Sequence, residues 1–434
     1  MKLLIVASGD FFSDYGGGQV YVKDLVDELV DQGLKPALAT PGDPSASLRY
    51  YRNCSVFAFS DAALNPGSGE ITALLQKVKP DLVHAHGAKR VFAEACRTAG
   101  IPCIVTAHHG GILCPAGTLL NHRDRICMIR ASHKDCLPCV LKNIRAGIFS
   151  WHVIRMLPLA TRLRLGMFLR KKAFIPYVTP VGTSSLSIQE RKDDWDAIFS
   201  NASLLVAPSR AIAGSMIRNG APDHKVKIIT HGIVLPDKID RDADKKAEDD
   251  FRDCIRFFYV GRICYVKGLH VLLEAFSHIR GNAELHIIGG AGNKAEKRYM
   301  QRMRKKYSKN RNVIWYDKIE KEKVNALISR LDVMVHPAIY LEVFGLTIAE
   351  ALALGKPVVA TRCGGAEEQI ESGRNGLLVE PNEAQVLTEA MQMFVDRAVD
   401  IEKMSQAGPD SVKSINEHAS ELTGLYKQLV AKTS

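Results

Sequence analysis

The sequence predicts two consecutive α/β domains, each built on a doubly wound, mostly parallel sheet. Short apolar runs alternate with helix-length segments, which is typical of parallel strands covered on both faces. A glycine loop at residues 16–18 follows the first run and precedes a helix that carries apolar residues at helical spacing up to Gly33. A charged stretch, Pro236–Asp250, is almost devoid of apolar residues and separates two series of such units. It is therefore the predicted linker.

The first series predicts an N-terminal domain over residues 1–238. Its predicted strands are Leu3–Ser8, Ala37–Thr40, Leu82–Ala85, Ile101–Ala107, Ser203–Ala207 and Lys227–Thr230. Within this domain we expect a Cys-rich and basic insertion at about residues 110–180, in which Pro158 and Gly166 interrupt any single long helix.

The second series predicts a C-terminal domain over residues 251–410. Its predicted strands are Ile255–Val260, Leu285–Ile288, Val313–Tyr316, Val333–Val335, Val358–Thr361 and Leu377–Val379. Its predicted helices are Gly268–Ile279, Lys294–Tyr307, Val324–Leu331, Thr347–Leu354 and one after Gly365. The tail reads as helical, and we expect residues 411–434 to pack back on the N-terminal domain.

Composition excludes several protein classes and favours an anionic partner. The 434 residues are 46% hydrophobic and 24% charged, which excludes wholesale disorder, collagen and coiled coil. The apolar runs are too short for a membrane span or a signal peptide, so a cytoplasmic location is expected. The net charge of +11 suits a nucleotide phosphate, an acidic lipid surface or nucleic acid.

The distribution of charge bears on the choice among these partners. No acidic residue lies between Cys136 and Gln189, where Lys and Arg are interleaved with apolar residues. The mixture is typical of an interfacial helix at an anionic membrane, and it equally fits a solvated basic face over an ordinary core helix.

Four of the ten cysteines are bunched, and they suggest a structural zinc site. Cys114, Cys127, Cys136 and Cys139 lie within 26 residues, and the last two have the spacing that lets both thiolates reach one Zn²⁺. The first two lack this spacing, so the nearby His109, His122 and His133 are alternative ligands, and ordinary thiols without a metal are the other interpretation.

Two segments of the C-terminal half carry the pattern of an anion and sugar site. Glu342 and Glu350 bracket Phe344, Gly345 and Leu346 just before a predicted helix, whose free N–H groups suit a phosphate or hydroxyl-rich ligand. Gly261, Arg262 and Lys267 follow a predicted strand, where ligands bind in open α/β sheets, and two cations there would neutralise a diphosphate.

The N-terminal half adds a glycine loop and four histidines. Gly16 and Gly17 permit close approach of backbone to an anion, but the dinucleotide and Walker A fingerprints are absent from the sequence. Hydride transfer and ATP hydrolysis therefore lose their main support. The histidines cluster at two predicted strand ends, and at least one of them is a candidate to face a ligand: His84, His86, His108 and His109.

Together these residues resemble the retaining glycosyltransferases of family 4, which have the GT-B fold of two Rossmann-like domains facing across a cleft. The segments that carry the resemblance are Gly261–Gly268, Glu342–Glu350, Gly364-Gly365 with Glu368, Asn375–Val379, the glycine loop, Val83–Gly87, Thr106–His108 and Pro208-Ser209. The Cys-rich segment resembles an insertion found in some bacterial members.

The resemblance implies transfer of a sugar from a nucleoside diphosphate sugar, a UDP- or GDP-sugar, to an acceptor hydroxyl with retention and without an obligatory metal. Arg262 and Lys267 would hold the diphosphate, Glu342 and the amides of residues 344–346 the sugar, and Glu350 the ribose. Gly16 and Gly17 would approach the phosphates, and His108 would contact the sugar at the reacting centre. A glycan or lipid-linked acceptor in lipopolysaccharide, capsule or exopolysaccharide synthesis is expected, with no nucleic acid partner.

Two local sequences depart from the family, and other functions remain open. His231–Val234 replaces the frequent Asn-Gly-Ile/Val-Asp, and Pro337-Ala338 replaces Pro-Ser. The alternatives are a non-catalytic membrane- or nucleic-acid-binding protein on the same scaffold, a nucleotide-sugar epimerase and a glycan phosphorylase. The complete set of Arg262, Lys267, Glu342 and Glu350 argues against a binding module, which has no use for a donor site.

Overall fold

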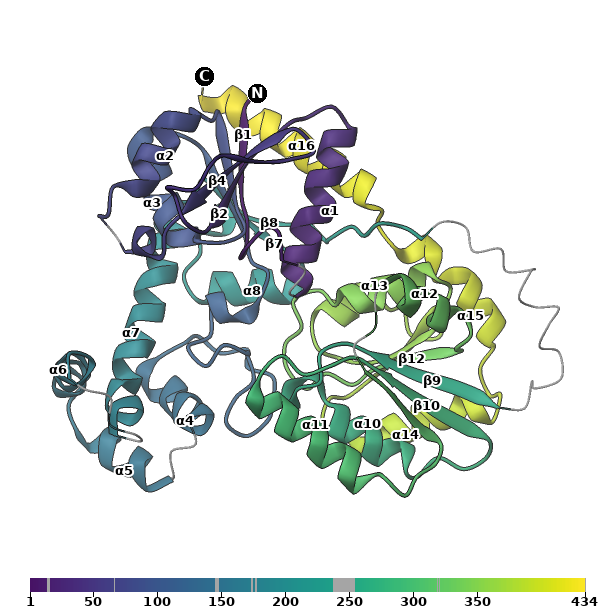
Figure 1. Ribbon diagram of the computed structural model, residues 1–434. Helices are drawn as coiled ribbons and strands as arrows, with labels where there is room; N and C mark the ends of the chain where they lie inside the picture. Colours follow the sequence, from purple (N-terminus) through teal and green to yellow (C-terminus); the bar gives the residue numbers. More distant parts are fainter. Residues whose placement is uncertain are drawn as a thin grey trace. The chain divides into compact units, whose positions relative to one another are not determined.

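A computed structural model describes residues 1–13, 16–65, 67–144, 148–172, 175, 178–236, 254–317, 319 and 321–433 (Figure 1). The chain forms two compact units. The first comprises Met1–His122, Cys127–Gly232 and Ile415–Ser434, and the second Arg123–Ile126 and Ile233–Ser414. The predicted linker lies outside the described residues from position 237 on. The first unit ends its main stretch at Gly232, six residues before the predicted boundary at 238.

The first unit is built on an eight-stranded sheet with the strand order β3-β4-β2-β1-β5-β6-β7-β8. The strands are β1 (Leu3–Val6), β2 (Ala37–Pro41), β3 (Arg49–Tyr51), β4 (Cys54–Phe59), β5 (Leu82–Ala85), β6 (Cys103–Thr106), β7 (Leu204–Ala207) and β8 (Val226–Ile228). Among the described strands of this sheet, only the edge pair β3 and β4 is antiparallel. The central strands are buried along their whole length, which explains their continuous apolar runs.

Helices cover this sheet and extend from it. They are α1 (Gly17–Asp31), α2 (Glu70–Val78), α3 (Lys89–Ala99), α4 (His133–Asn143), α5 (Ile148–Met156), α6 (Leu159–Arg170), α7 (Val178–Asn201), α8 (Arg210–Arg218) and α16 (Ile415–Thr433). Short 3₁₀ turns are η1 (Asp61–Leu64), η2 (Gly110–Ile112) and η3 (Asp223–Lys225). The last helix, α16, belongs to the first unit and runs beside α1 (Figure 1).

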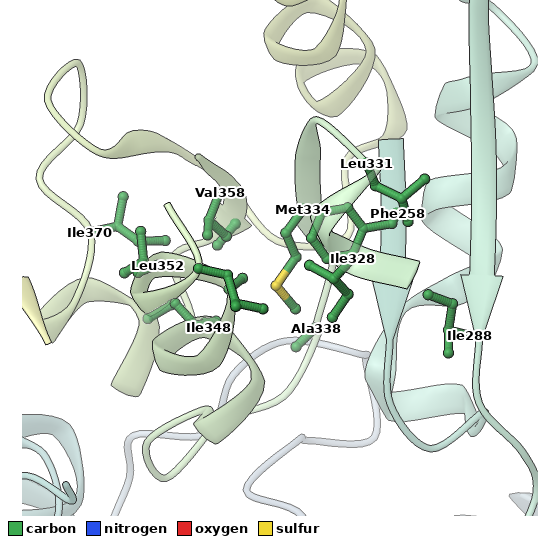
Figure 2. Packing of buried hydrophobic residues seen from close by; sticks show 14 of the residues in the cluster. Phe258, Ile288, Ile328, Leu331, Met334, Ala338, Ile348, Leu352, Val358 and Ile370 are labelled. Atoms are coloured by element: carbon green, nitrogen blue, oxygen red, sulfur yellow. The ribbon is translucent and has the colours of Figure 1, made fainter. Parts of the chain in front are cut away.

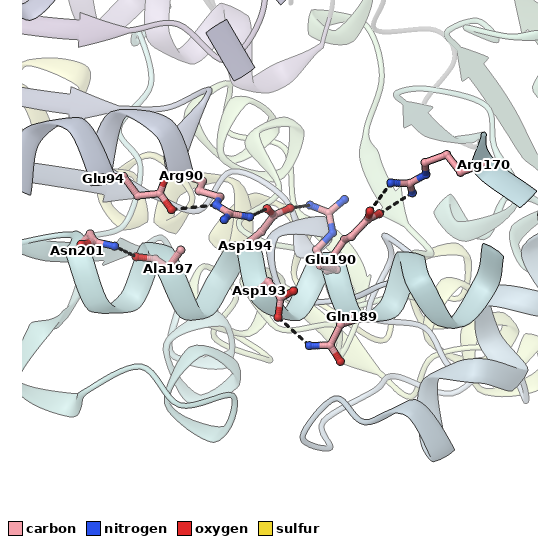
Figure 3. A network of polar contacts seen from close by, with 10 residues as sticks. Arg90, Glu94, Arg170, Gln189, Glu190, Asp193, Asp194, Ala197 and Asn201 are labelled. Carbon is pink, nitrogen blue, oxygen red and sulfur yellow. Dashed lines mark hydrogen bonds and ion pairs between the residues drawn. The ribbon is translucent and has the colours of Figure 1, made fainter. Parts of the chain in front are cut away.

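The long helix α7 ties the basic insertion to the sheet-covering helices. Arg90 of α3 contacts Asp194 of α7 at 3.0 Å, and Arg170 of α6 pairs with Glu190 of α7 (Figure 3). Pro158 separates α5 from α6, as predicted. Gly166, by contrast, does not interrupt a helix: it lies inside α6, because a Cβ there would come within 2.9 Å of Leu186 Cβ on α7. Glycine therefore permits close packing of the two helices.

The second unit contains a six-stranded parallel sheet with the order β11-β10-β9-β12-β13-β14. The strands are β9 (Ile255–Val260), β10 (Ala283–Ile288), β11 (Val313–Tyr316), β12 (Val333–His336), β13 (Val358–Thr361) and β14 (Gly376–Val379). The helices are α10 (Leu269–Phe276), α11 (Lys294–Lys306), α12 (Lys321–Ser329), α13 (Leu346–Ala353), α14 (Ala384–Val395) and α15 (Ile401–Ala407). The segment after Gly365 is a 3₁₀ turn, η5 (Gly365–Glu368); further turns are η4 (Tyr265–Lys267) and η6 (Pro409–Ser411).

The core of the second unit holds the site-bearing strands in register. Phe258 of β9, Met334 of β12 and Val358 of β13 are buried completely and lie together with Ile348 and Leu352 of α13 (Figure 2). Burying each such side chain stabilises the fold by about 1.5–3 kcal/mol. The packing fixes where β9 and β12 end, and hence where the loops that follow them begin.

Candidate active site

In the second sheet, the candidate site lies where the direction of strand winding reverses. β9 pairs with β10 on one side and with β12 on the other, although β10 and β11 precede β12 in the chain. Crevices at such switch points, beyond the carboxyl ends of the strands, are where doubly wound sheets bind ligands. The loop after β9 carries Arg262 and Lys267, and the loop after β12 carries Glu342. The two predicted motifs thus meet at one edge.

Lys267 and Glu342 form the centre of this site. Lys267 Nζ donates to Glu342 Oε2 at 2.5 Å, and Tyr340 Oη donates to Glu342 Oε1 at 2.8 Å. His336 Nε2 lies 3.4 Å from the same Oε2, and the ammonium of Lys267 lies 5.4 Å from the Tyr340 ring centroid. The Glu342 side chain is only 11% exposed, so its charge depends on these neighbours.

The electrostatics keep this pair ionised despite its burial. Burial alone would raise the pKa of Glu342, but the Lys267 ammonium and the His336 ring outweigh it and hold that pKa well below its usual range. Burial would likewise lower the pKa of Lys267, and the Glu342 carboxylate raises it instead. Burial also lowers the pKa of His336. The site therefore offers a desolvated cation beside a desolvated anion at neutral pH.

Backbone contacts fix the loop that carries Glu342. Its N–H donates to Cys363 O at 2.7 Å, and its carbonyl accepts from Gly365 N at 3.0 Å. Gln369 Nε2 donates to Phe344 O at 2.5 Å. A Cβ at Gly365 would lie 2.4 Å from Phe344 Cα, so this close approach requires glycine. The Gly364-Gly365 segment can therefore pack directly against the 342–345 loop and hold it in position.

The remaining predicted donor residues of this unit lie on the loop after β9 and at the start of α13. Gly345 is the N-cap of α13 with φ +91°, and Leu346 begins that helix, so its free N–H groups lie next to Glu342 in the chain. Glu350 lies one turn further along α13 and is partly buried. Arg262 follows Gly261 after β9; its side chain is 62% exposed and its Nη1 lies 3.7 Å from Glu296 Oε1. An exposed guanidinium is available to an incoming anion.

Gly268 is required by both its conformation and its surroundings. Its φ is +73°, and a Cβ there would lie 1.7 Å from Pro337 O. We therefore expect Gly268→Ala to lower the free energy of unfolding of the second unit by about 3 kcal/mol or more. Gly373→Ala is the matched control, since Gly373 has φ +88° but nothing within 4 Å of its Cβ position. Urea unfolding measures the free energy of unfolding of both variants. Equal losses in the two would show that the close contact with Pro337 O is not the cause.

The first unit gathers buried histidines at the ends of β5 and β6. His84 bonds Tyr426 Oη and Thr106 Oγ1, each at 2.7 Å, and His86 Nδ1 lies 2.6 Å from His108 Nε2. His418 Nε2 lies 2.6 Å from Tyr21 Oη. His231 stacks on His108 with centroids 5.3 Å apart. Helix α16 thus supplies two members of the cluster, His418 and Tyr426, and helix α1 supplies Tyr21.

The glycine loop lies next to this cluster. Gly16 is the N-cap of α1, and Gly17 is its first residue, so both lie at the end of the helix that has free N–H groups. A Cβ at Gly18 would lie 3.6 Å from His108 Cβ. His108 is partly exposed, whereas His84 and His86 are fully buried. Among the four histidines singled out in the sequence, His108 and His109 are the ones open to a ligand.

The four bunched cysteines, where the sequence predicts a zinc site, lie near enough to influence one another's pKa. Cys114, Cys136 and Cys139 are buried, and Cys139 Sγ lies 4.0 Å from His122 Nδ1. Burial raises the pKa of Cys136 to about 12 and that of Cys139 to about 11; backbone hydrogen bonds at Ser132 and His122 oppose this, and the neighbouring thiols add to it. Among the residues that the structure describes, no group of three or more His, Cys, Asp or Glu is arranged to hold a metal ion. The zinc site stays a prediction.

Metal analysis tests that prediction directly. If the four thiolates bind Zn²⁺, protein purified from metal-replete cells carries about one zinc per chain, and Cys136→Ser loses most of it. Cys254→Ser is the control, because Cys254 lies in the other unit and is partly exposed. A zinc content near zero in the unaltered protein would contradict the zinc site, and the four cysteines would then be ordinary thiols of the core.

Several residues of the two clusters escaped the sequence analysis. His336 ends an ordinary apolar strand, and Tyr340 lies in a loop two positions before Glu342. Neither belongs to a sequence motif, so only the contact with Glu342 in the structure identifies them. Tyr21 reads as one apolar position of α1. His418 and Tyr426 lie more than 300 residues from their partners, and no local pattern reveals such a contact.

Comparison with known proteins places the chain in a family. The model described as Glycosyltransferase Family 4 matches residues 15–136, and the one described as Glycosyl transferases group 1 matches residues 240–410. An uncharacterized glycosyltransferase of Methanocaldococcus jannaschii is 26% identical over 188 residues, which are 43% of this chain and 47% of that protein. The chain spans about half the length of these curated relatives that it matches.

Solved structures agree in fold. The Anabaena protein Alr3699/HepE, solved in complex with UDP, has a TM-score of 0.67 at 18% identity, covering 99% of this chain and 100% of that one. Sucrose-phosphate synthase from Thermosynechococcus elongatus has a TM-score of 0.69 at 20% identity, covering 99% of each chain. The two parallel-sheet units, the strand-end motifs and the matched models agree: the chain belongs to the family 4 glycosyltransferases and has the GT-B fold.

Proposed function

We propose that this protein is a retaining glycosyltransferase that moves a sugar from a UDP- or GDP-sugar to an acceptor hydroxyl. The observation that carries the proposal is the buried Lys267–Glu342 pair at the carboxyl ends of β9 and β12, with the exposed Arg262 on the same loop as Lys267. A diphosphate has the charge that two cations neutralise, and a sugar offers the hydroxyls that a carboxylate binds. The UDP complex of the similar Anabaena structure supports a nucleotide donor.

In this mechanism the protein mainly stabilises leaving charge. The bond from the anomeric carbon to the diphosphate oxygen breaks while the acceptor oxygen attacks from the same face, and a donor phosphate oxygen takes the acceptor proton. Lys267 and Arg262 stabilise the departing diphosphate, so neither a side-chain nucleophile nor a metal is needed. Glu342 and the amides of residues 344–346 hold the sugar. Glu350 holds the ribose, and His108 and the N–H groups near Gly17 contact the sugar and the phosphates.

We further propose that the acceptor is a glycan or lipid-linked molecule at the inner membrane face, as in lipopolysaccharide, capsule or exopolysaccharide synthesis. Helices α5 and α6, with Lys171 and Lys172 directly after α6, combine basic residues with exposed apolar side chains, among them Met156 at 81% and Phe168 at 57% exposure. Such surfaces bind anionic lipid headgroups. None of the described helices has both the length and the apolar character needed to span a bilayer.

Liposome sedimentation tests this docking. The protein is expected to sediment with phosphatidylglycerol vesicles at low salt, less so at high salt, and not with phosphatidylcholine vesicles. Met156→Glu together with Phe168→Glu should weaken sedimentation, because each places an anion on the docking face. Met393→Glu is the control, since Met393 is an exposed apolar residue of the other unit. Sedimentation that is the same with and without anionic vesicles would remove the membrane from the proposal.

Acceptor-dependent release of nucleoside diphosphate distinguishes the transferase from its alternatives. A transferase frees UDP or GDP from its donor far faster when membrane glycolipid is added, and the sugar appears on that lipid. An epimerase converts the donor sugar without acceptor, and a phosphorylase consumes inorganic phosphate. A purely binding protein releases no diphosphate under any of these conditions, and that outcome would overturn the proposal.

A further inference from the structure

His86 and His108 share one hydrogen in the first unit. His86 Nδ1 and His108 Nε2 lie 2.6 Å apart, a separation at which only one of the two nitrogens carries a hydrogen. Either His86 donates to His108 or the reverse. In either case the nitrogen of His108 that is left to meet a ligand is Nδ1, and the direction decides whether Nδ1 is a donor or an acceptor.

The surroundings of His86 decide the direction. His86 Nε2 is buried and has no hydrogen-bond partner among the described residues. If His108 donated, neutral His86 would carry its hydrogen on Nε2. That buried N–H would have no acceptor, and an unpaired buried N–H is rarer than an unpaired buried acceptor and costs more free energy. If His86 donates from Nδ1, only a lone pair is left at Nε2. His108 then holds its own hydrogen on Nδ1.

Packing holds both rings in this arrangement. The His86 ring lies 4.1 Å from that of His84, which is itself bonded on both sides by Tyr426 and Thr106. The His108 ring stacks on His231 and contacts Tyr21 at 5.1 Å between centroids. Neither ring carries a charge that would change this direction, because burial lowers the pKa of both His86 and His108 well below the usual value of histidine. Both rings are neutral at physiological pH.

We propose that His86 is a positioning residue that fixes His108 as the tautomer with hydrogen on Nδ1, so that His108 donates a hydrogen bond to a hydroxyl oxygen of the transferred sugar. This inference deepens the proposed function and rests on it for the identity of the ligand. The tautomer itself is a property of the unliganded protein. It can therefore be tested without any donor.

NMR of the full chain labelled with ¹⁵N-histidine tests the tautomer. Two-bond ¹H–¹⁵N correlations from the ring carbons show which nitrogen is protonated, and His108→Gln identifies the His108 signals by their loss. The expected spectrum shows His108 protonated at Nδ1 and His86 protonated at Nδ1. A His108 protonated at Nε2 would overturn the inference, and it would leave the proposed function intact.

Two substitutions of His86 then separate positioning from bulk packing. His86→Asn keeps an N–H donor near the place of Nδ1, whereas His86→Leu keeps the volume and removes the donor. We expect His86→Leu to lower kcat about tenfold, the equivalent of one hydrogen bond, and His86→Asn to restore most of it. His224→Leu, at an exposed histidine of the same unit, is the control.

The outcomes distinguish the two proposals. Equal losses in the Asn and Leu variants, with an unchanged His108 tautomer, would make His86 a packing residue and overturn the inference. If the unaltered protein turned over no nucleotide sugar, the proposed function would fail instead, and the NMR result would still decide the tautomer.

Discussion

Lys267→Ala is expected to lower kcat for sugar transfer by about 10²- to 10³-fold, the cost of removing one preorganised group that stabilises leaving charge. Glu342→Gln should give a loss of similar order, because the amide binds sugar hydroxyls but no longer matches the Lys267 charge. Lys305→Ala is the control, since Lys305 is an exposed lysine of the same unit. Turnover within a few-fold of the unaltered protein in both site variants would show that Lys267 and Glu342 do not form a donor site.

The double variant separates this loss from unfolding. Removing Lys267 alone leaves the Glu342 charge buried without its main partner, which costs about 3–5 kcal/mol of stability. Lys267→Ala combined with Glu342→Gln removes that charge as well. It is expected to recover much of the stability measured in urea and none of the turnover. If activity returned together with stability, the pair would be structural.

Acid is expected to unfold the first unit well before its carboxylates are protonated. Burial lowers the pKa of His84 to about 3 and that of His86 and His108 well below the usual value of about 6.5, so the folded unit excludes protons that the unfolded chain binds. The stability is thus fully present above pH 6.5 and is lost as pH falls below it. Each such histidine contributes about 1.4 kcal/mol per pH unit.

Urea unfolding between pH 7.5 and 5.0 measures this slope. Trp315→Phe leaves the two tryptophans of the first unit, Trp151 and Trp195, as reporters. The expected result is a loss of several kcal/mol between pH 6.5 and 5.0. His84→Phe should reduce the slope by about one proton, and His224→Gln, at an exposed histidine, should not. A stability independent of pH over this range would mean that the cluster opens to water in the folded protein.

The sequence was sufficient for the strands that are buried on both faces, and for the motif residues that follow them. β1 is a continuous apolar run, and β9 and β13 are apolar apart from Arg256 and Thr361, so their pattern is typical of buried strands. It was insufficient at the edge, where β3 is a short polar run, Arg49–Tyr51, that pairs antiparallel with β4. Edge strands lack the double burial on which the pattern depends.

In the candidate site, too, some residues could be predicted from the sequence and others could not. Lys267 and Glu342 are 75 residues apart, yet both were predicted, because each belongs to a local motif at a strand end. The partners that set their charges, His336 and Tyr340, and the residues that α16 brings to the histidine cluster belong to no local motif. Their roles arise from tertiary packing, which brings them beside the motif residues after the chain has folded.

The most direct test of the donor site is a thermal-shift measurement of the purified protein with UDP, GDP, ADP and CMP and their sugar conjugates. A ligand that binds only the folded state raises the unfolding midpoint by mass action. If Lys267 and Glu342 form a donor site, one nucleoside diphosphate and its sugar conjugate, a UDP- or GDP-sugar, raise the midpoint, and Lys267→Ala abolishes the shift while Lys305→Ala keeps it. No shift with any of these ligands, or a shift unchanged by Lys267→Ala, would contradict a donor site built on Lys267 and Glu342.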